Sequence, residues 1–320
     1  MKAFTITKND ANQRLDKFLI KTLKTMPKSL VYKSLRKKKI KVNGKRITDG
    51  GFPLSEGDFL EAYINDEFFD EQPNRHAFLA LTSAPLDIIY EDENIIAVNK
   101  PQGLSVHADE TGSPDTLIHR IQRYLYDKGE YIPEQDQTFA PALAHRIDRN
   151  TQGLVLAAKN AEALRILCEK IKQKEIQKYY LCIVRGHLPK TSDTLRAYHI
   201  KDETTKMAKI YDRPTEDAKE MITQYKVLKQ YQNHDLAEIK LITGRTHQIR
   251  AHMAHIGHPL LGDGKYGKLD KSIAVNRQAL AAYKLVFDFT TDAGILSYLN
   301  RKELQIQNPT LVPAALEAGL

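Results

Sequence analysis

A polar stretch in the middle of the chain carries side chains that could do chemistry. Residues 145–152 read His-Arg-Ile-Asp-Arg-Asn-Thr-Gln, so an imidazole, two guanidinium groups and the carboxylate of Asp148 share one short run. Residues 154–158 are apolar and follow Gly153, and an apolar run behind a glycine predicts a buried strand. The polar residues would then form a loop on a rigid scaffold, where reactive groups are often found. The alternative is a surface loop in which Asp148 pairs with a neighbouring arginine, because such ion pairs are common and weak.

Four histidines lie between residues 247 and 258, which raises the question of a metal site. His252 and His255 are three positions apart on an expected helix, a spacing that two metal ligands can share. No cysteine or carboxylate has a matching spacing, and two cysteines in the whole chain are too few for a zinc site alone. We therefore predict no metal. The apolar residues of this stretch predict the buried side of the helix: Ile249, Met253 and Ile256.

The composition sets the class of protein. The chain has 320 residues, a hydrophobic content of 42% and a formal net charge of +8. These values suit two domains and mildly favour a polyanionic partner. No apolar run of about 18 residues is present, so we expect no membrane span, and the N-terminus lacks the apolar run of a signal peptide. Cys168 and Cys182 lie in apolar patterns, so we expect two buried free thiols and a reducing compartment, the cytoplasm.

The positive charge is concentrated near the N-terminus. Eleven lysines and arginines and no acidic residue lie in residues 21–46, whereas residues 56–71 contain seven acidic residues. This change of sign predicts a small domain over residues 1–75, which ends in an acidic linker, and a second domain over residues 76–320. The linker itself is expected over residues 66–85.

Local patterns inside the basic segment predict a defined fold. Apolar residues at helical spacing predict two short helices, one around Leu15 and one that begins at Pro27, and Asn43-Gly44 predicts a β-hairpin. The order Arg-Leu-Asp-Lys-Phe-Leu, Pro-Lys-Ser, Lys-Val-Asn-Gly-Lys resembles an S4 domain, a module that binds structured RNA. A solvated basic face on a small domain is the alternative. The resemblance implies that six basic side chains face RNA phosphates: Lys28, Lys33, Arg36, Lys37, Lys38 and Lys39.

Hydrophobic periodicity outlines the second domain. Helices are expected after Asp115 and Asn160, each with that residue as its N-cap. Residues 187–220 are polar and are expected to form a connection with loosely held strands, and the residues from about Pro309 a tail. Two strands are expected within residues 87–101, and one each in residues 154–158, 176–186, 221–231 and 235–243.

Several elements of the second domain resemble, in the right order, motifs of the RluA/RluC/RluD family of pseudouridine synthases. The elements are Lys-Pro-x-Gly (100–103), His-Arg-Ile-Asp-x-x-Thr-x-Gly-Leu (145–154), Ile-x-Lys-x-Tyr (176–180), Gly-Arg-Thr-His-Gln-Ile-Arg (244–250) and Arg-x-x-Leu-x-Ala (277–282). The departures from the family pattern are Ile147, Asn150, Gln152 and Ala281. The pattern of the S4 domain is most similar to the RluC branch of the family.

The resemblance assigns roles to particular side chains. It implies that Asp148 is catalytic, that Arg250 keeps it ionised and oriented, and that Tyr180 holds the uracil base. It further implies that four residues contact the substrate: Arg146, at the place that the base leaves in the RNA, and Leu280, Arg245 and His247.

Pseudouridine formation breaks the N1–C1′ bond of a uridine, turns the base and joins C5 to C1′, and it consumes no external reagent. The chain has no phosphate-binding glycine loop and no dinucleotide fingerprint, so no cofactor is expected. The target uridine must leave its stack to enter a pocket. The sequence leaves three roles for Asp148: attack on the base, attack on C1′, or removal of a ribose proton.

We therefore expect an α+β fold, with a mixed, mainly antiparallel sheet in the catalytic domain (the pseudouridine synthase fold) behind a small α/β S4 domain. The expected function is isomerisation of specific uridines in RNA, with large-subunit (23S) ribosomal RNA as the partner, no membrane and a monomeric state. A non-catalytic RNA-binding or ribosome-assembly module is the first alternative, but Asp148, Tyr180 and Arg250 are all intact. A two-carboxylate glycoside hydrolase is the second, and Asp263 is the nearest candidate for its other acid.

Overall fold

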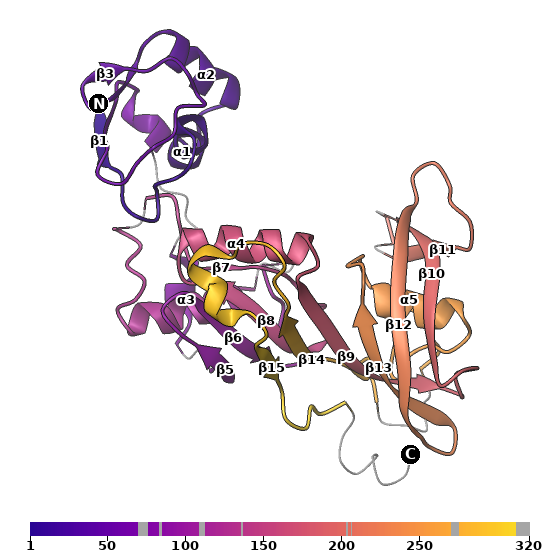
Figure 1. Cartoon of the computed structure of the whole chain (residues 1–320). Helices are drawn as coiled ribbons and strands as arrows, with labels where there is room; N and C mark the ends of the chain where they lie inside the picture. Colours follow the sequence, from indigo (N-terminus) through magenta and orange to yellow (C-terminus); the bar gives the residue numbers. More distant parts are fainter. Residues whose placement is uncertain are drawn as a thin grey trace.

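The protein contains two separate sheets (Figure 1). The computed structural model describes residues 1–69, 76–82, 85–108, 113–135, 137–202, 204–205, 207–269 and 275–311. None of the helices in these ranges is long and apolar enough to cross a bilayer.

The N-terminal part is a four-stranded sheet in the order β1-β4-β2-β3 with two helices. Its elements are β1 (Lys2–Thr5), α1 (Leu15–Thr22), α2 (Lys28–Arg36), β2 (Ile40–Val42), β3 (Lys45–Arg46) and β4 (Phe59–Ala62). The predicted hairpin is confirmed, because Asn43 and Gly44 join β2 to β3 with φ angles of 51° and 75°. Both predicted helices are confirmed, and Leu15 lies fully buried in the core of this part.

The acidic segment is more ordered than a linker. A 3₁₀ turn, η1 (Asp66–Phe69), places Phe69 5.9 Å from the ring of Phe4 in the N-terminal core. A second 3₁₀ turn, η2 (Ala77–Ala80), buries Phe78 completely in the core of the second part. Residues 70–75 and 83–84 of the expected linker lie outside the described residues.

Hydrogen bonds join the two parts. Asp10 is fully buried and accepts hydrogen bonds from the backbone N–H and the hydroxyl of Thr138, at 3.0 and 2.5 Å. Asn9 Oδ1 accepts a hydrogen bond of 3.2 Å from the N–H of Ala161, at the start of helix α4 (Ala161–Lys172). These contacts are polar and specific, and no pattern in the sequence indicates them.

The second sheet has 11 strands, and nine of them follow the order β11-β10-β12-β13-β9-β14-β8-β6-β5. It is mixed but mainly antiparallel, as predicted, and the parallel pair is β14 with β8. Its strands are β5 (Ile88–Glu91), β6 (Ile95–Lys100), β7 (Ala142–Leu143), β8 (Gln152–Ala158), β9 (Ile176–Arg185), β10 (Ser192–Lys201), β11 (Ala208–Tyr211), β12 (Lys219–Gln230), β13 (His234–Leu241), β14 (Leu280–Phe287) and β15 (Glu303–Gln305). The helical elements are α3 (Leu117–Asp127), α4, α5 (Gln248–His255) and the 3₁₀ helix η3 (Gly294–Leu299).

The continuous apolar run before Lys159 is explained by burial on both sides of the sheet. Along β8, Val155 and Ala157 pack in one core with α3, while Leu154 and Leu156 pack in a second core with α4. A strand covered on both faces needs no polar alternation. The predicted buried strand is therefore confirmed, and it gives the polar loop in front of it a rigid base.

Three predictions about local structure are wrong. The N-cap of α3 is Thr116, whose hydroxyl accepts from His119 N–H, because Asp115 instead pairs with Arg120. Asn160 caps α4 as predicted. The buried side of α4, however, turns Cys168 outward, so one of the two thiols is exposed.

The third wrong prediction concerns residues 187–220. They do not form a loose connection, because β10 pairs with β12 through eight consecutive residues and β11 pairs with β10. The sequence of β10 is polar because one face of this end of the sheet is solvent-exposed. In the predicted tail, Leu311 is buried in the protein, and residues 312–320 lie outside the described part.

Candidate active site

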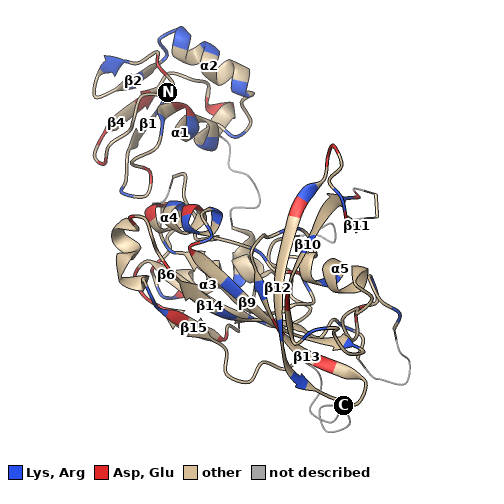
Figure 2. Cartoon of the chain, turned by 45° about the vertical axis from the view of Figure 1, so that its right-hand side comes forward, with Lys and Arg blue, Asp and Glu red and all other residues tan. Residues whose placement is uncertain are grey.

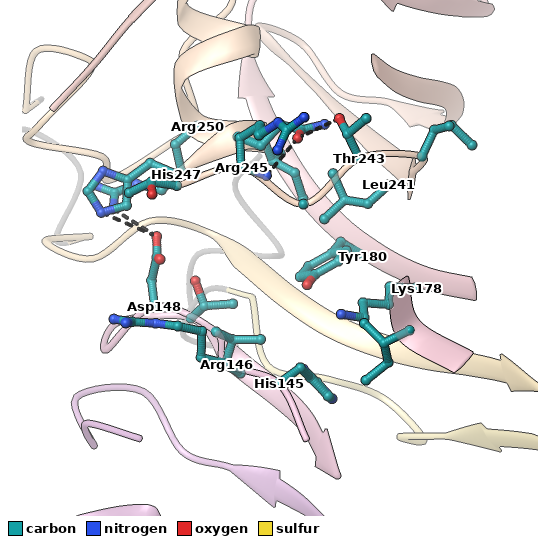
Figure 3. A pocket seen from close by; sticks show the side chains of 18 of the residues that line it. His145, Arg146, Asp148, Lys178, Tyr180, Leu241, Thr243, Arg245, His247 and Arg250 are labelled. Carbon is teal, nitrogen blue, oxygen red and sulfur yellow. Dashed lines mark hydrogen bonds and ion pairs between the residues drawn. The ribbon is translucent and has the colours of Figure 1, made fainter. Parts of the chain in front are cut away.

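One cavity of about 1020 Å³ gathers all seven residues expected to contact or transform the substrate. It lies between the loop before β8, the strands β9, β13 and β14, and the start of α5 (Figure 3). The seven residues that line it are Arg146, Asp148, Tyr180, Arg245, His247, Arg250 and Leu280. The six expected RNA-binding residues of the N-terminal part do not line it; all six are exposed on or just after α2.

The Asp148 loop is held close to the centre of the sheet. The N–H of Thr151 donates a hydrogen bond of 3.0 Å to the carbonyl oxygen of Asp148, which closes a tight turn before β8. Gly153 follows with a φ of +137°, and a Cβ atom there would lie 2.3 Å from the carbonyl oxygen of Ala282. Only glycine allows β8 and β14 to approach this closely. The approach brings Asp148 and Leu280 to the same cavity.

A buried lysine fixes the same loop from behind. Lys100 is fully buried, and its Nζ donates three hydrogen bonds of 2.9 Å to backbone carbonyl oxygens: Pro101, Leu104 and Arg149. Arg149 in turn donates from Nε to the carbonyl oxygen of Gly103. Burial lowers the pKa of Lys100 to about 7. The Lys-Pro-x-Gly element therefore acts through the backbone next to Asp148.

Arg250 connects Asp148 to a second carboxylate. Its Nη1 donates to Asp148 Oδ2 at 3.0 Å, while Nε and Nη2 form a fork with Asp263 at 2.7 and 2.9 Å. Burial opposes the ionisation of Asp263, but the hydrogen bonds and charge of Arg250 lower the pKa of its carboxyl below the usual value. Asp263 is thus an ionised positioning group. It cannot serve as the protonated acid that a glycoside hydrolase requires.

The start of α5 is anchored to β12, which aims Arg250. Gln248 is buried and donates from Nε2 to Ile222 O and Thr223 Oγ1, at 2.9 and 3.0 Å. His247 precedes it in a left-handed conformation, φ 51°, which turns the imidazole into the cavity. Gln248 therefore holds the start of α5 in place, and the neighbouring His247 faces the cavity.

His247 lies beside the carboxylate of Asp148 without a close hydrogen bond to it. Its Nε2 is 3.9 Å from Asp148 Oδ2, and its Nδ1 is 2.9 Å from the hydroxyl of Tyr266. Burial lowers the pKa of His247, against the opposing charge of Asp148. The ring of Tyr266 also stacks under Arg250, with the guanidinium carbon 5.3 Å from its centroid. Tyr266 therefore supports two residues of the site.

Tyr180 and Leu280 form an apolar wall of the cavity, and Figure 3 shows Tyr180 across the cavity from Asp148. Tyr180 and Leu280 lie on the neighbouring strands β9 and β14 and are 7% and 4% exposed. Burial, followed by the charge of Asp148, raises the pKa of Tyr180, so its hydroxyl stays protonated. The ring of Tyr180 makes this wall partly aromatic, which suits the face of a base.

The cavity is strongly basic. Its lining includes nine lysines and arginines but one carboxylate, Asp148. Arg146 is exposed at the edge, two residues from Asp148, and Arg245 donates from Nε to the carbonyl oxygen of Glu220. Such a lining favours a polyanionic substrate.

The histidines of α5 have structural partners. His252 Nδ1 is 2.9 Å from Thr223 Oγ1, and His255 Nε2 is 2.7 Å from Asp212 Oδ1. Across the described parts of the chain, no group of three or more His, Cys, Asp and Glu side chains could hold a metal ion.

Three residues of the site were not predicted. The sequence indicates Asp263 only as a candidate acid and not as the partner of Arg250, and no pattern indicates Tyr266. Lys178 lines the cavity beside Tyr180. A pattern that could have indicated Lys178 is the Ile-x-Lys-x-Tyr element, in which alternation puts the lysine on the same face as the tyrosine.

The fold and the site define an RNA-modifying isomerase with an RNA-binding module, and comparisons with known proteins agree. Residues 94–255 match the RNA pseudouridylate synthase family, and residues 13–60 match the S4 domain. The chain is 36% identical to an RNA pseudouridine synthase of Mycoplasma capricolum, over 97% of this chain and 98% of that protein. It is 34% identical to the ribosomal large subunit pseudouridine synthase C of Escherichia coli, over 90% and 88% of the two chains.

A solved structure supports the fold. Human RNA pseudouridylate synthase domain containing 1 superposes with a TM-score of 0.55 at 22% identity, over 73% of this chain and 87% of that one. The chain therefore belongs to the RNA pseudouridylate synthase family. It is an RNA pseudouridine synthase with an N-terminal S4 domain.

Proposed function

We propose that this enzyme isomerises specific uridines of large-subunit (23S) ribosomal RNA and that Asp148 carries the reaction. The observation that supports the role of Asp148 is its position: Arg250 holds its carboxylate at 3.0 Å inside a basic cavity, opposite the wall of Tyr180. The names of the relatives in Escherichia coli and Haemophilus ducreyi, which are ribosomal large subunit pseudouridine synthases C, support the choice of RNA.

The side chains would divide the work as follows. Tyr180 and Leu280 hold the extruded uracil, and Arg146 at the edge fills the place that the base leaves. Arg250 keeps Asp148 ionised and directs it to the nucleotide. Arg245 and His247 contact the substrate on the α5 side of the cavity. The bond from N1 to C1′ breaks, the base turns within the cavity, and C5 takes the place of N1.

The basic residues on and after α2 would bind RNA away from the reacting base. Figure 2 colours the Lys and Arg positions of α2 blue, and this helix belongs to the N-terminal part. The proposal therefore assigns affinity for RNA to residues 1–75 and the isomerisation reaction to residues 76–320. It includes a monomeric enzyme that acts in the cytoplasm.

The experiment compares pseudouridine maps of ribosomal RNA from cells with and without this protein. We expect one or a few large-subunit sites to revert to uridine and to be restored by the wild-type gene but not by the Asp148→Asn variant. Purified protein should modify the same sites in a transcript of the large-subunit RNA. An unchanged large-subunit map, or a loss confined to another RNA class, would overturn the choice of substrate.

A further inference from the structure

One charged group in the cavity is not used by the fold. Within the described parts of the chain, the side chain of Lys178 makes no hydrogen bond and no ion pair, although the residue lies mostly buried on β9. A partly desolvated ammonium without a partner is unfavourable, and proteins normally pair or neutralise such groups. The ammonium group of Lys178 lies at the wall of the candidate active site, next to Tyr180 (Figure 3).

The immediate neighbours of Lys178 on its face of the sheet offer one possible acceptor, the hydroxyl of Tyr180, and the ammonium makes no hydrogen bond to it. Along β9 these are Ile176 and Tyr180, two residues away on either side. Across the sheet, Lys178 stands directly opposite Leu241 of β13 and Leu285 of β14. Three of these four side chains are aliphatic and the fourth is the phenol of Tyr180, so the ammonium lies over a mostly apolar surface without a carboxylate.

The nearby imidazole does not pair with Lys178. His145 lies on the same side of the cavity (Figure 3), and its Nε2 already accepts a hydrogen bond of 3.2 Å from the N–H of Leu156. Burial and the charge of Lys178 lower the pKa of His145, so the two groups repel one another when charged. Burial also lowers the pKa of Lys178 to about 8. An oxygen of a bound ligand would relieve this desolvation.

We propose that Lys178 donates a hydrogen bond to a carbonyl oxygen of the target uracil, O2 or O4, and holds the base against Tyr180 while it is detached from the ribose. The inference rests on the proposed function and adds the contact that orients the base. Asp148 and Arg250 act from the opposite side of the cavity, so the uracil would lie between the two groups.

The contact has a chemical purpose. When the N1–C1′ bond breaks with its electron pair on the base, negative charge spreads over N1, O2 and O4. A fixed ammonium at one of these oxygens stabilises that charge. The pair on C5 then forms the C5–C1′ bond, the C5 proton leaves, and N1 gains a proton. Lys178 keeps its own proton throughout, and no oxidant or reductant is needed.

The first experiment compares Lys178→Met with Lys284→Met on a synthetic stem-loop of the target site. Lys284 is a matched control, because it lies on the neighbouring strand β14 but on the opposite face, where it packs 4.4 Å from the ring centroid of Tyr179. We expect Lys178→Met to lower kcat by about 10²- to 10³-fold, as for the loss of one oxyanion donor. Its Kd for RNA should change little, its resistance to urea should stay equal or rise, and Lys284→Met should retain full turnover.

A second measurement identifies the oxygen. Stem-loops with 2-thiouridine or 4-thiouridine at the target replace one carbonyl oxygen with sulfur, a weaker acceptor. The thio substitution at the contacted position should slow the wild type but not slow Lys178→Met further, whereas the other substitution should affect both proteins equally. Lys178→Arg, which keeps the charge, should recover part of the rate.

Three outcomes would overturn the inference. The first is equal turnover of Lys178→Met and wild type, and the second is additive losses of rate with both thio substitutions. The third is a decrease of about 0.7 in the slope of log K for RNA binding against log salt in Lys178→Met. The last result would assign Lys178 to a phosphate. If the wild type itself leaves the stem-loop and the large-subunit RNA unmodified, the proposed function fails. An active wild type with an equally active Lys178→Met counts against Lys178 alone.

Discussion

Nη1 of Arg250 lies 3.0 Å from Oδ2 of Asp148, although the two residues are 102 positions apart in the chain. The other two nitrogens of the same guanidinium bind Asp263, which is fully buried. The guanidinium of Arg250 thus bonds to two carboxylates. Asp263 holds the guanidinium in position, and Asp148 faces the cavity. Arginine suits this task because its donors point in two fixed directions.

Replacement of Asp148 by Asn should abolish isomerisation and leave the fold intact. Asn keeps the shape of the side chain but removes the charge on which each of the three candidate roles depends. The measurement is pseudouridine formation by purified protein, with RNA affinity and urea unfolding as controls. Appreciable turnover by a pure, folded Asp148→Asn sample would rule out the assignment.

Changes at Arg250 should affect both activity and stability. Arg250→Met leaves the carboxylate of Asp263 buried without a partner, which should lower the free energy of unfolding by about 3–5 kcal/mol. Arg250→Lys should lose less stability, but one ammonium cannot serve both carboxylates, so its turnover should be impaired. Urea unfolding and initial rates measure the two effects.

The double variant Arg250→Met with Asp263→Asn is the control. It removes the uncompensated charge, so it should recover part of the stability and none of the activity. Normal turnover by Arg250→Lys, or equal stability of Arg250→Met and wild type, would contradict the role given to this arginine.

The stability of the protein should decrease as the pH falls below about 6.5. Burial lowers the pKa of His252 from 6.5 to about 4, so the unfolded chain binds a proton before the folded protein does. The contribution of His252 to the free energy of unfolding is therefore fully present above pH 6.5. It decreases by up to about 3 kcal/mol as the pH falls from 6.5 to 4. Burial lowers the pKa of His145 and His199 in the same direction.

Urea unfolding of the wild type and His252→Asn at several pH values checks this prediction. Asn can keep a hydrogen bond to Thr223 but cannot take up the proton. The variant should show a flatter pH dependence than the wild type. Parallel curves for the two proteins would show that His252 does not cause the acid sensitivity.

Neutralising basic residues after α2 should weaken RNA binding and reduce its salt dependence. Each phosphate contact contributes about 0.7–0.9 to the slope of log K against log salt, so Lys37→Gln with Lys39→Gln should flatten it by about 1.5. The control is Lys226→Gln with Lys229→Gln, two exposed lysines of β12. Equal slopes for the test pair and wild type would remove these two lysines from the RNA interface.

The two cysteines should differ in reactivity. Cys168 is exposed, whereas Cys182 is fully buried and burial raises its pKa to about 12. A thiol reagent at pH 8 should therefore modify one cysteine in the native protein and two after unfolding. Cys168→Ser should show none in the native state, and two native equivalents would contradict the buried position of Cys182.

Much of the fold and the site could be predicted because the relevant patterns are local. The Asn43-Gly44 turn, the Asn160 cap and the apolar run of β8 each depend on a few adjacent residues. The pairing of Asp148 with Arg250 is not local, and it was predicted from the resemblance to known motifs. The structure then showed that both residues line one cavity.

The remaining features depend on contacts between distant residues. The role of Asp263 follows from its distance to Arg250, which the separation of 13 positions does not indicate. β10 was mistaken for a connection because its exposed face is polar. The bonds between Asp10 and Thr138, 128 positions apart, involve common side chains without a recognisable pattern. Such features need the three-dimensional structure.

The position of β14 has a consequence for the order in which the protein folds as it is synthesised. All four strands of the S4 sheet lie before residue 63, so that module can fold while the rest is still being translated. β14, in contrast, comes late in the chain yet lies between β9 and β8. Until β14 emerges from the ribosome, β9 and β8 each have an unpaired edge. The cavity also lacks Leu280, the first residue of β14. We therefore expect a nascent chain to bind RNA through the S4 module before its active site is complete.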